Sequence, residues 1–93
     1  MKTIFRFDLQ EAAMQTIEMP KGAQILHIAR QTRFPLRLSL WALVDPDAPP
    51  VERQIQLVGT GHGEVPDEGA TFIATYQEAS GYVWHFFDRG EVQ

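Results

Sequence analysis

The chain has 93 residues, of which 44% are hydrophobic and 11% aromatic, and it contains no cysteine. That apolar share is enough for one small core and excludes wholesale disorder, and the lack of cysteine excludes disulfides, Cys-based zinc sites and thiol nucleophiles. The net charge of −4, with only eight scattered Lys and Arg, argues against a nucleic-acid partner.

The first third of the chain alternates between apolar and polar residues, which is the period-2 pattern of strands. Residues 3–9 place Phe5, Phe7 and Leu9 on one face, and residues 15–19 alternate in the same way. Between them, residues 10–14 favour a connector of at most one helical turn. The charges at positions 6 and 8 leave no apolar signal-peptide core.

Two reversals flank the next predicted strand, residues 23–31. Pro20-Lys21-Gly22 favours a turn before it, and Arg33-Phe34-Pro35 favours another after it. Strict alternation within the strand would put Leu26 with Ile28 on one face, opposite His27 and its neighbours.

Residues 36–44 form the best candidate for a central strand. Every second residue from Leu36 to Val44 is apolar, and the opposite face turns from polar to apolar along its length. We therefore expect the second half of this strand to be buried on both sides, with Trp41 buried. The uncharged run 38–44 is too short to span a bilayer.

The second half of the chain continues with strands and turns. Three prolines within residues 45–50 exclude a strand interior, and Asp45 and Asp47 favour an Asx turn. Strands are predicted at 51–59, 70–77 and 82–88, with a glycine-rich loop at 59–69 and a tight turn at Ser80-Gly81. A frayed C-terminus is expected from about residue 90.

Six or seven short strands with turn signals between them predict an all-β fold. We expect one domain over residues 1–93, built as a small antiparallel β-sandwich or a partly open barrel.

The glycine-rich loop is the first candidate site. Gly61, His62 and Glu64 lie where glycines permit close approach of a ligand to the backbone. Two interpretations stay open here. The loop binds a small, nucleotide-like ligand, or its glycines serve only turn geometry. The second is favoured, because no helix and no lysine follow and the next charges, Glu64, Asp67 and Glu68, repel phosphate.

The sequence gives little support for catalysis or for metal binding. The three histidines, His27, His62 and His85, lack ligand spacing, so we expect no metal and no cofactor. Neither Ser39 nor Ser80 lies in a strand-to-helix turn with a histidine at readable spacing. The sequence predicts a protein that is not an enzyme.

The last strand is aromatic on both faces, with Trp84 and Phe86 on one side and Phe87 on the other. Core burial explains most of these residues. A strand that is apolar on both faces in so thin a protein must nevertheless be covered, either by a central position or by a partner. We therefore take Trp84 and Phe86 as further candidate binding residues and expect a homodimer, with pairing of edge strands as one mechanism.

Four segments together resemble a known family: residues 17–26, Leu40-Trp41-Ala42-Leu43-Val44-Asp45-Pro46 and its continuation to 49, Gly59-Thr60-Gly61-His62, and Tyr82-Val83-Trp84-His85 with residues 86 and 87. Their order and spacing are similar to a family of small uncharacterised proteins encoded by tailed bacteriophages and prophages. The resemblance implies a phage product acting in the cytoplasm of a bacterial host. It implies no catalytic or binding residue.

The function that these features favour is a non-enzymatic, phage-encoded accessory protein that binds another protein. A bacterial host or defence protein, which it would inhibit, is the expected partner. The alternative is a small-ligand module that uses the loop 59–68. Neither nucleic acid nor a membrane is an expected partner.

Overall fold

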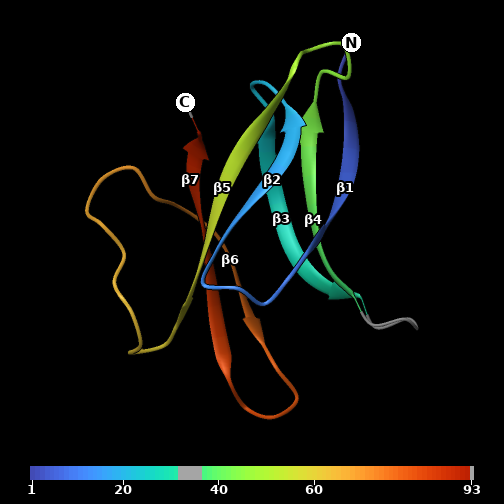
Figure 1. The fold of residues 1–93 in the computed structure, drawn as a ribbon. Helices are drawn as coiled ribbons and strands as arrows, with labels where there is room; N and C mark the ends of the chain where they lie inside the picture. Colours follow the sequence, from blue (N-terminus) through green and yellow to red (C-terminus); the bar gives the residue numbers. More distant parts are fainter. Residues whose placement is uncertain (32–36, 93) are drawn as a thin grey trace.

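The structure, a computed structural model, describes residues 1–31 and 37–92 and has seven strands and no helix within that part of the chain. The strands are β1 (Thr3–Leu9), β2 (Met14–Pro20), β3 (Gln24–Gln31), β4 (Arg37–Val44), β5 (Pro50–Gly59), β6 (Thr71–Gln77) and β7 (Val83–Glu91). They form a three-stranded sheet in the order β1-β4-β3 and a four-stranded sheet in the order β2-β5-β7-β6, both antiparallel (Figure 1). The predicted all-β sandwich is confirmed, and the two sheets do not close into a barrel.

The described residues include no helix of the length and hydropathy needed to cross a membrane.

The turns follow the predicted chemistry. Ala23 N donates to Pro20 O at 3.2 Å, and Gly22 takes the φ of +79° that this turn requires. Asp47 N donates to Asp45 Oδ1 at 3.0 Å, which confirms the Asx turn. Between β6 and β7, Gly81 N donates to Glu78 O at 3.0 Å and closes the tight turn.

Two connections differ from the prediction or lie outside the described residues. Residues 10–13, which the sequence allowed to form a helical turn, are an irregular connection without one. Gln15 ties it together, because its side chain donates to Gln10 O at 2.7 Å and accepts from Gln10 N at 3.2 Å. The reversal expected at Arg33-Phe34-Pro35 lies outside the described residues.

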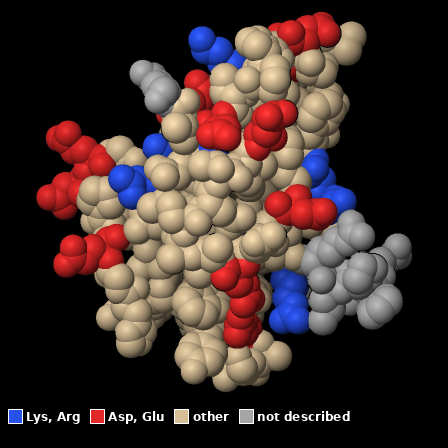
Figure 2. All heavy atoms as spheres, in the orientation of Figure 1, with Lys and Arg blue, Asp and Glu red and all other residues tan. Residues whose placement is uncertain are grey.

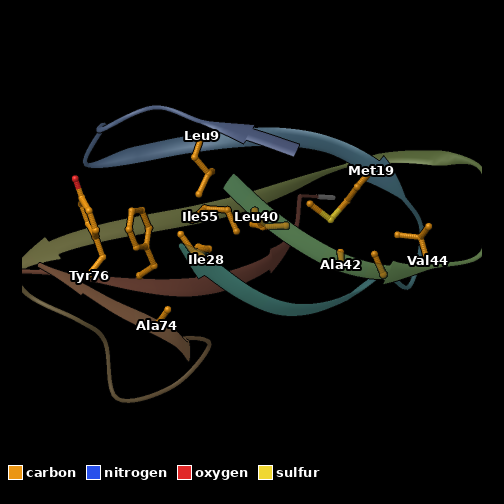
Figure 3. Close-up of a cluster of buried hydrophobic side chains, with 11 residues drawn as sticks. Leu9, Met19, Ile28, Leu40, Ala42, Val44, Ile55, Ala74 and Tyr76 are labelled. Carbon is orange, nitrogen blue, oxygen red and sulfur yellow. The ribbon is translucent and has the colours of Figure 1, made fainter. Parts of the chain in front are cut away.

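The core lies between the two sheets, where both contribute side chains (Figure 3). Its buried members are Leu9, Met19, Ala23, Ile28, Leu40, Ala42, Val44, Ile55, Ala74, Tyr76 and Phe86. Half-buried apolar residues that pack against them are Phe7, Ile17, Ile25, Leu38, Leu57, Ile73 and Trp84. Alternate residues of each strand therefore face inward, as the period-2 pattern requires.

A β-bulge in β3 changes the predicted faces of that strand. Ile25 pairs with Ala42 and His27 pairs with Trp41, so Leu26 is one extra residue against β4. The bulge turns Ile25 and Ile28 toward the core, although strict alternation would separate them. The prediction that Leu26 shares a face with Ile28 is wrong, since Leu26 is 42% exposed.

Strand β4 is central in the three-stranded sheet, as expected, but Trp41 is not buried. Leu40, Ala42 and Val44 face the core, so Trp41 and Leu43 point to the outer face and are only half-buried. Their half-burial shows that the described part of the chain leaves this end of the outer face partly accessible. The prediction that this strand is buried on both sides is therefore wrong.

One ion pair lies on the core-facing side of the four-stranded sheet. Arg53 on β5 donates two hydrogen bonds to the Asp88 carboxylate on β7, at 2.9 and 2.7 Å, and a third to Ala23 O at 2.8 Å. The side chains of Arg53 and Asp88 are 13% and 14% exposed. The hydrogen bond to Asp88 raises the pKa of Arg53, so the guanidinium stays charged.

The C-terminal strand is longer than predicted. Gly90 and Glu91, expected in a loose C-terminal segment, belong to β7. The Glu91 carboxylate accepts a hydrogen bond from Gly22 N at 2.7 Å, and Val92 N donates to Glu52 O at 2.8 Å. These contacts join the chain end to the β2–β3 turn and to β5.

Candidate functional site

Two pockets lie at the turn between β6 and β7. The first, which we call the aromatic pocket, has a volume of about 340 Å³. It is lined by Gly59, Thr60, His62, Gly81, Tyr82, Val83 and Trp84. The end of β5, the loop that follows it and the start of β7 thus contribute to one cavity.

The structure brings together two of the five candidate residues. His62 and Trp84 line the aromatic pocket. Gly61 is exposed in the turn beside it, where His62 N donates to Gly59 O at 3.0 Å. Glu64 lies farther along the loop, and Phe86 is a fully buried core residue and unavailable to any ligand.

Close contact of Gly59 with Trp84 shapes this pocket. The two residues pair across β5 and β7, and a Cβ atom at Gly59 would lie 3.2 Å from Trp84 Cζ3. A side chain at this position would press on the indole, whereas the backbone itself would accept one, because the φ of Gly59 is not in the left-handed region. The indole is thereby free to lie against the strand and to stack with Tyr82, with ring centroids 5.9 Å apart and planes at 24°.

Hydrogen bonds to the rest of the fold anchor the loop between β5 and β6, which forms a wide arc beside the four-stranded sheet (Figure 1). Gln56 donates to Glu64 O at 2.8 Å and Arg89 donates to Gly69 O at 3.2 Å. Gly61, Gly63 and Gly69 all have positive φ. The glycines therefore serve turn geometry, whatever else the loop does.

His85 lies on the opposite face of β7 from Trp84 and joins the residue that follows β5 to a residue of β6. Its two ring nitrogens lie 2.7 Å from Thr60 Oγ1 and 3.0 Å from Thr75 Oγ1. Both nitrogens are thus engaged in structure, which leaves neither free for a ligand.

The second pocket, which we call the acidic pocket, has a volume of about 440 Å³. It is lined by Glu11, Arg30, Leu38, Tyr76, Glu78, Ala79 and Ser80. Sequence reasoning missed it, because its residues come from four separate parts of the chain. The Tyr76 hydroxyl donates to Glu11 Oε1 at 3.1 Å, and Ser80 Oγ donates to Glu78 Oε2 at 2.9 Å.

The two glutamates of the acidic pocket shift each other's pKa in opposite directions. A hydrogen bond to Glu78, followed by partial burial, raises the pKa of Glu11. The same hydrogen bond, followed by that from Ser80, lowers the pKa of Glu78. Burial raises the pKa of Tyr76, which stays a neutral donor to Glu11.

Trp84 lines the aromatic pocket and also affects Glu78, a residue of the acidic pocket. Its indole is close enough to Glu78 to add to the lowering of that pKa. Its Nε1 is nevertheless buried without a hydrogen bond of good geometry to any described residue. An unpaired buried N–H is unfavourable, so this indole is held by packing and not by polar contacts.

The arrangement is suited to binding. Within residues 1–31 and 37–92, no three His, Asp or Glu side chains are grouped to hold a metal ion. The aromatic pocket is lined by two stacked rings and by two glycines, which have no side chain. The acidic pocket beside it contains two carboxyl groups. An apolar group fits the first. The second holds the cationic side chain of Arg30 beside its two carboxyl groups, so it offers polar partners of both charges.

A family model described as a domain of unknown function, DUF7352, matches residues 1–93. The chain belongs to this family. Searches of the curated proteins and of the solved structures found no match. The DUF7352 family therefore spans the whole sandwich, including both pockets.

Proposed function

We propose that this protein is a non-enzymatic protein-binding module whose aromatic pocket holds a side chain of its partner. The observation that carries the proposal is the exposed Tyr82, 65% accessible, stacked on Trp84 at an open cavity. Tyr and Trp in pockets are the residues that most often dominate the free energy of protein–protein binding. A rigid aromatic pair also loses little conformational entropy when a partner binds.

The chemistry of the two pockets defines the partner segment. The aromatic pocket accepts an apolar or aromatic side chain. The acidic pocket starts only one residue earlier in the turn, at Ser80, and its Glu11, Glu78 and Arg30 offer polar partners of both charges. Asp and Glu side chains are also spread over the face shown in Figure 2, in keeping with the net charge of −4. The expected partner surface is basic and carries a protruding apolar residue.

A small planar ligand is the second candidate, because the stacked rings offer a surface to any flat molecule. A nucleotide suits the pocket less well than a side chain does. The loop beside it carries Glu64, Asp67 and Glu68, which repel phosphate.

The biological setting belongs to the same proposal. The resemblance of the sequence to phage proteins supports a bacterial protein as the partner and the host cytoplasm as the place of action. Inhibition of a host or defence protein is one consequence of such binding.

The test uses Tyr82→Ala, with Phe72→Ala as the matched control. Phe72 is a similarly exposed aromatic residue, 56% accessible, but it pairs with Phe87 on the outer face of the same sheet. The partner is captured from bacterial lysate with the parent protein, purified, and titrated against each variant. We expect Tyr82→Ala to weaken binding at least about tenfold, the range of an interface hot spot, and Phe72→Ala to leave it unchanged.

Equal binding by the parent and Tyr82→Ala would refute the aromatic pocket as the contact. A melting temperature raised by a nucleotide or another planar ligand, and lost in Tyr82→Ala, would favour the small-ligand module.

A further inference from the structure

The two sheets have four edge strands, and three of them carry features that oppose pairing with another chain. β3 has a bulge at Leu26, and β6 has a register shift between Phe72 and Ala74. These two edges also lie next to each other across the sandwich. β2 ends in Pro20, which has no backbone N–H to donate.

Strand β1 has none of these features. It pairs with β4 in unbroken register over all seven residues and forms the free edge of the three-stranded sheet (Figure 1). It contains no proline, no glycine and no bulge. Ile4 and Phe5 are 56% and 38% exposed along it. A regular, apolar edge of this kind is a template for a further strand.

We infer that β1 pairs antiparallel with β1 of a second copy of this chain, about a two-fold axis through Phe7. In this register Phe7 faces Phe7 of the second copy and Phe5 faces Leu9. Arg6 faces Asp8 of the second copy, and Asp8 faces Arg6. Every position from Phe5 to Leu9 therefore meets a residue of matching character.

Side-chain direction fits this register. Leu9 is buried in the core and Phe7 packs against it, whereas Arg6 and Asp8 lie on the outer face, where they already form an ion pair. Pairing position 5 with 9 and 6 with 8 keeps inner faces together and outer faces together. The inner faces of the two copies then share one apolar row, and the outer faces share two more ion pairs.

Neighbouring registers of the same parity are worse. A shift by one pair toward the N-terminus puts the axis on Arg6 and sets the two guanidinium groups against each other. A further shift puts the axis on Phe5 and leaves Arg6 opposite the apolar Ile4. Like charges directly opposite one another destabilise a strand pair, so charge selects the axis at Phe7.

The pairing joins two three-stranded sheets into one continuous sheet of twice the width. It also covers the exposed Phe5 and uses none of the residues that line the aromatic pocket. This inference is therefore independent of the proposed function, and either can fail without the other.

Light scattering on the intact protein at tens of micromolar tests the dimer. We expect twice the chain mass of 10.6 kDa. Arg6→Asp alone and Asp8→Arg alone should each halve that mass, because each sets like charges opposite one another. An equimolar mixture of the two variants should return to the dimer mass, since every acidic side chain then faces a basic one. Lys2→Glu, which changes the net charge as much as Arg6→Asp but lies outside the paired residues, should remain dimeric.

The single-chain mass for the parent protein overturns the inference. So does a dimer that survives both charge variants, a mixture that stays monomeric, or loss of the dimer in Lys2→Glu. Far-UV circular dichroism melts of each variant show whether a lost dimer reflects a lost fold.

Crosslinking tests the register. Because the chain has no cysteine, Phe7→Cys introduces a single thiol, on the two-fold axis, where the facing Cα atoms of an antiparallel pair lie about 4.5–5.5 Å apart. We expect oxidation to give a covalent dimer with Phe7→Cys and none with Phe5→Cys, whose thiol would face Leu9. The opposite result places the axis elsewhere and refutes this register.

Discussion

At the scale of single residues, polar contacts join strands and turns in addition to the apolar contacts of the core. Arg53 is the clearest case, because its guanidinium joins Asp88 on the neighbouring strand to the carbonyl of Ala23 in the β2–β3 turn. The Arg53 guanidinium thus donates a hydrogen bond to the Ala23 carbonyl, which an apolar side chain at position 53 could not do.

Asp88→Asn should therefore destabilise the protein by about 2–3 kcal/mol, since charged hydrogen bonds contribute about 1.5–3 kcal/mol and Arg53 would remain largely buried without a counter-charge. Urea unfolding measures the free energy. Asp67→Asn, in the exposed loop, controls for the charge and should change little. The double variant Arg53→Met with Asp88→Leu should recover part of the loss, because an apolar pair has no charge to desolvate. A loss for Asp88→Asn as small as that of the control would contradict the structure.

Glu11 gives a second expectation at this scale, and it concerns pH. The folded state raises the pKa of Glu11, so its stabilising contribution is present at low pH and is lost as pH rises through that raised value. For Glu78, whose pKa is lowered, the contribution is present above the ordinary value and is lost as pH falls through the lowered one. The contact is therefore most stable between the two pKa values, where Glu11 carries a proton and Glu78 does not.

Glu11→Gln should raise the melting temperature at pH 7, because the amide donates to Glu78 without a charge. The gain should shrink as the pH falls toward the ordinary carboxyl range of about 4.3, where Glu11 itself becomes protonated. Glu68→Gln, in the loop after β5, serves as the control for net charge. A gain that is the same at every pH would show that the protonation of Glu11 is not its cause.

At the scale of elements, the bulge in β3 sets which residues of that strand face inward. Deleting Leu26 should leave a folded protein, because Ile25 and His27 would then pair consecutively with Ala42 and Trp41, as they already do. Deleting Trp41 from the regularly paired β4 should instead prevent folding, since Leu40 or Ala42 would leave the core face. Circular dichroism and the unfolding midpoint compare the two.

The Leu26 deletion should also make the protein more prone to self-association, because it restores an unbroken edge to β3. A deletion variant that fails to fold would show that the bulge does more than absorb one extra residue.

Strand positions could be predicted from the sequence because they depend on local pattern. Residues 3–9 alternate and are bounded by polar connections, and the structure has β1 over the same residues. The bulge could not be predicted, since Ile25-Leu26-His27-Ile28 reads as ordinary alternation and only the pairing with β4 reveals the extra residue. The prediction that Trp41 is buried was wrong for a related reason. Apolar residues at consecutive positions of a strand do not show that both faces of the strand are buried, since Trp41 and Leu43 are only half-buried.

At the scale of the whole molecule, the candidate sites could be predicted only in part. His62 and Trp84 were found because glycine clusters and aromatic strands are visible in the sequence. Gly59 was missed as a pocket residue, because its contact with Trp84 depends on the β5–β7 pairing. The acidic pocket was beyond prediction, since Glu11 and Glu78 are separated by most of the chain and meet only once both sheets have formed.

The strand order has a consequence for how the protein is made. β7 lies between β5 and β6, yet it is the last strand of the fold to leave the ribosome. Until then β6 has no neighbour in its sheet, β5 pairs only with β2, and the core lacks Phe86. The four-stranded sheet therefore closes only after nearly all of the fold has been translated. A chain cut short before Val83 would present β6 as an unpaired strand, and β5 with one open edge, to chaperones and proteases.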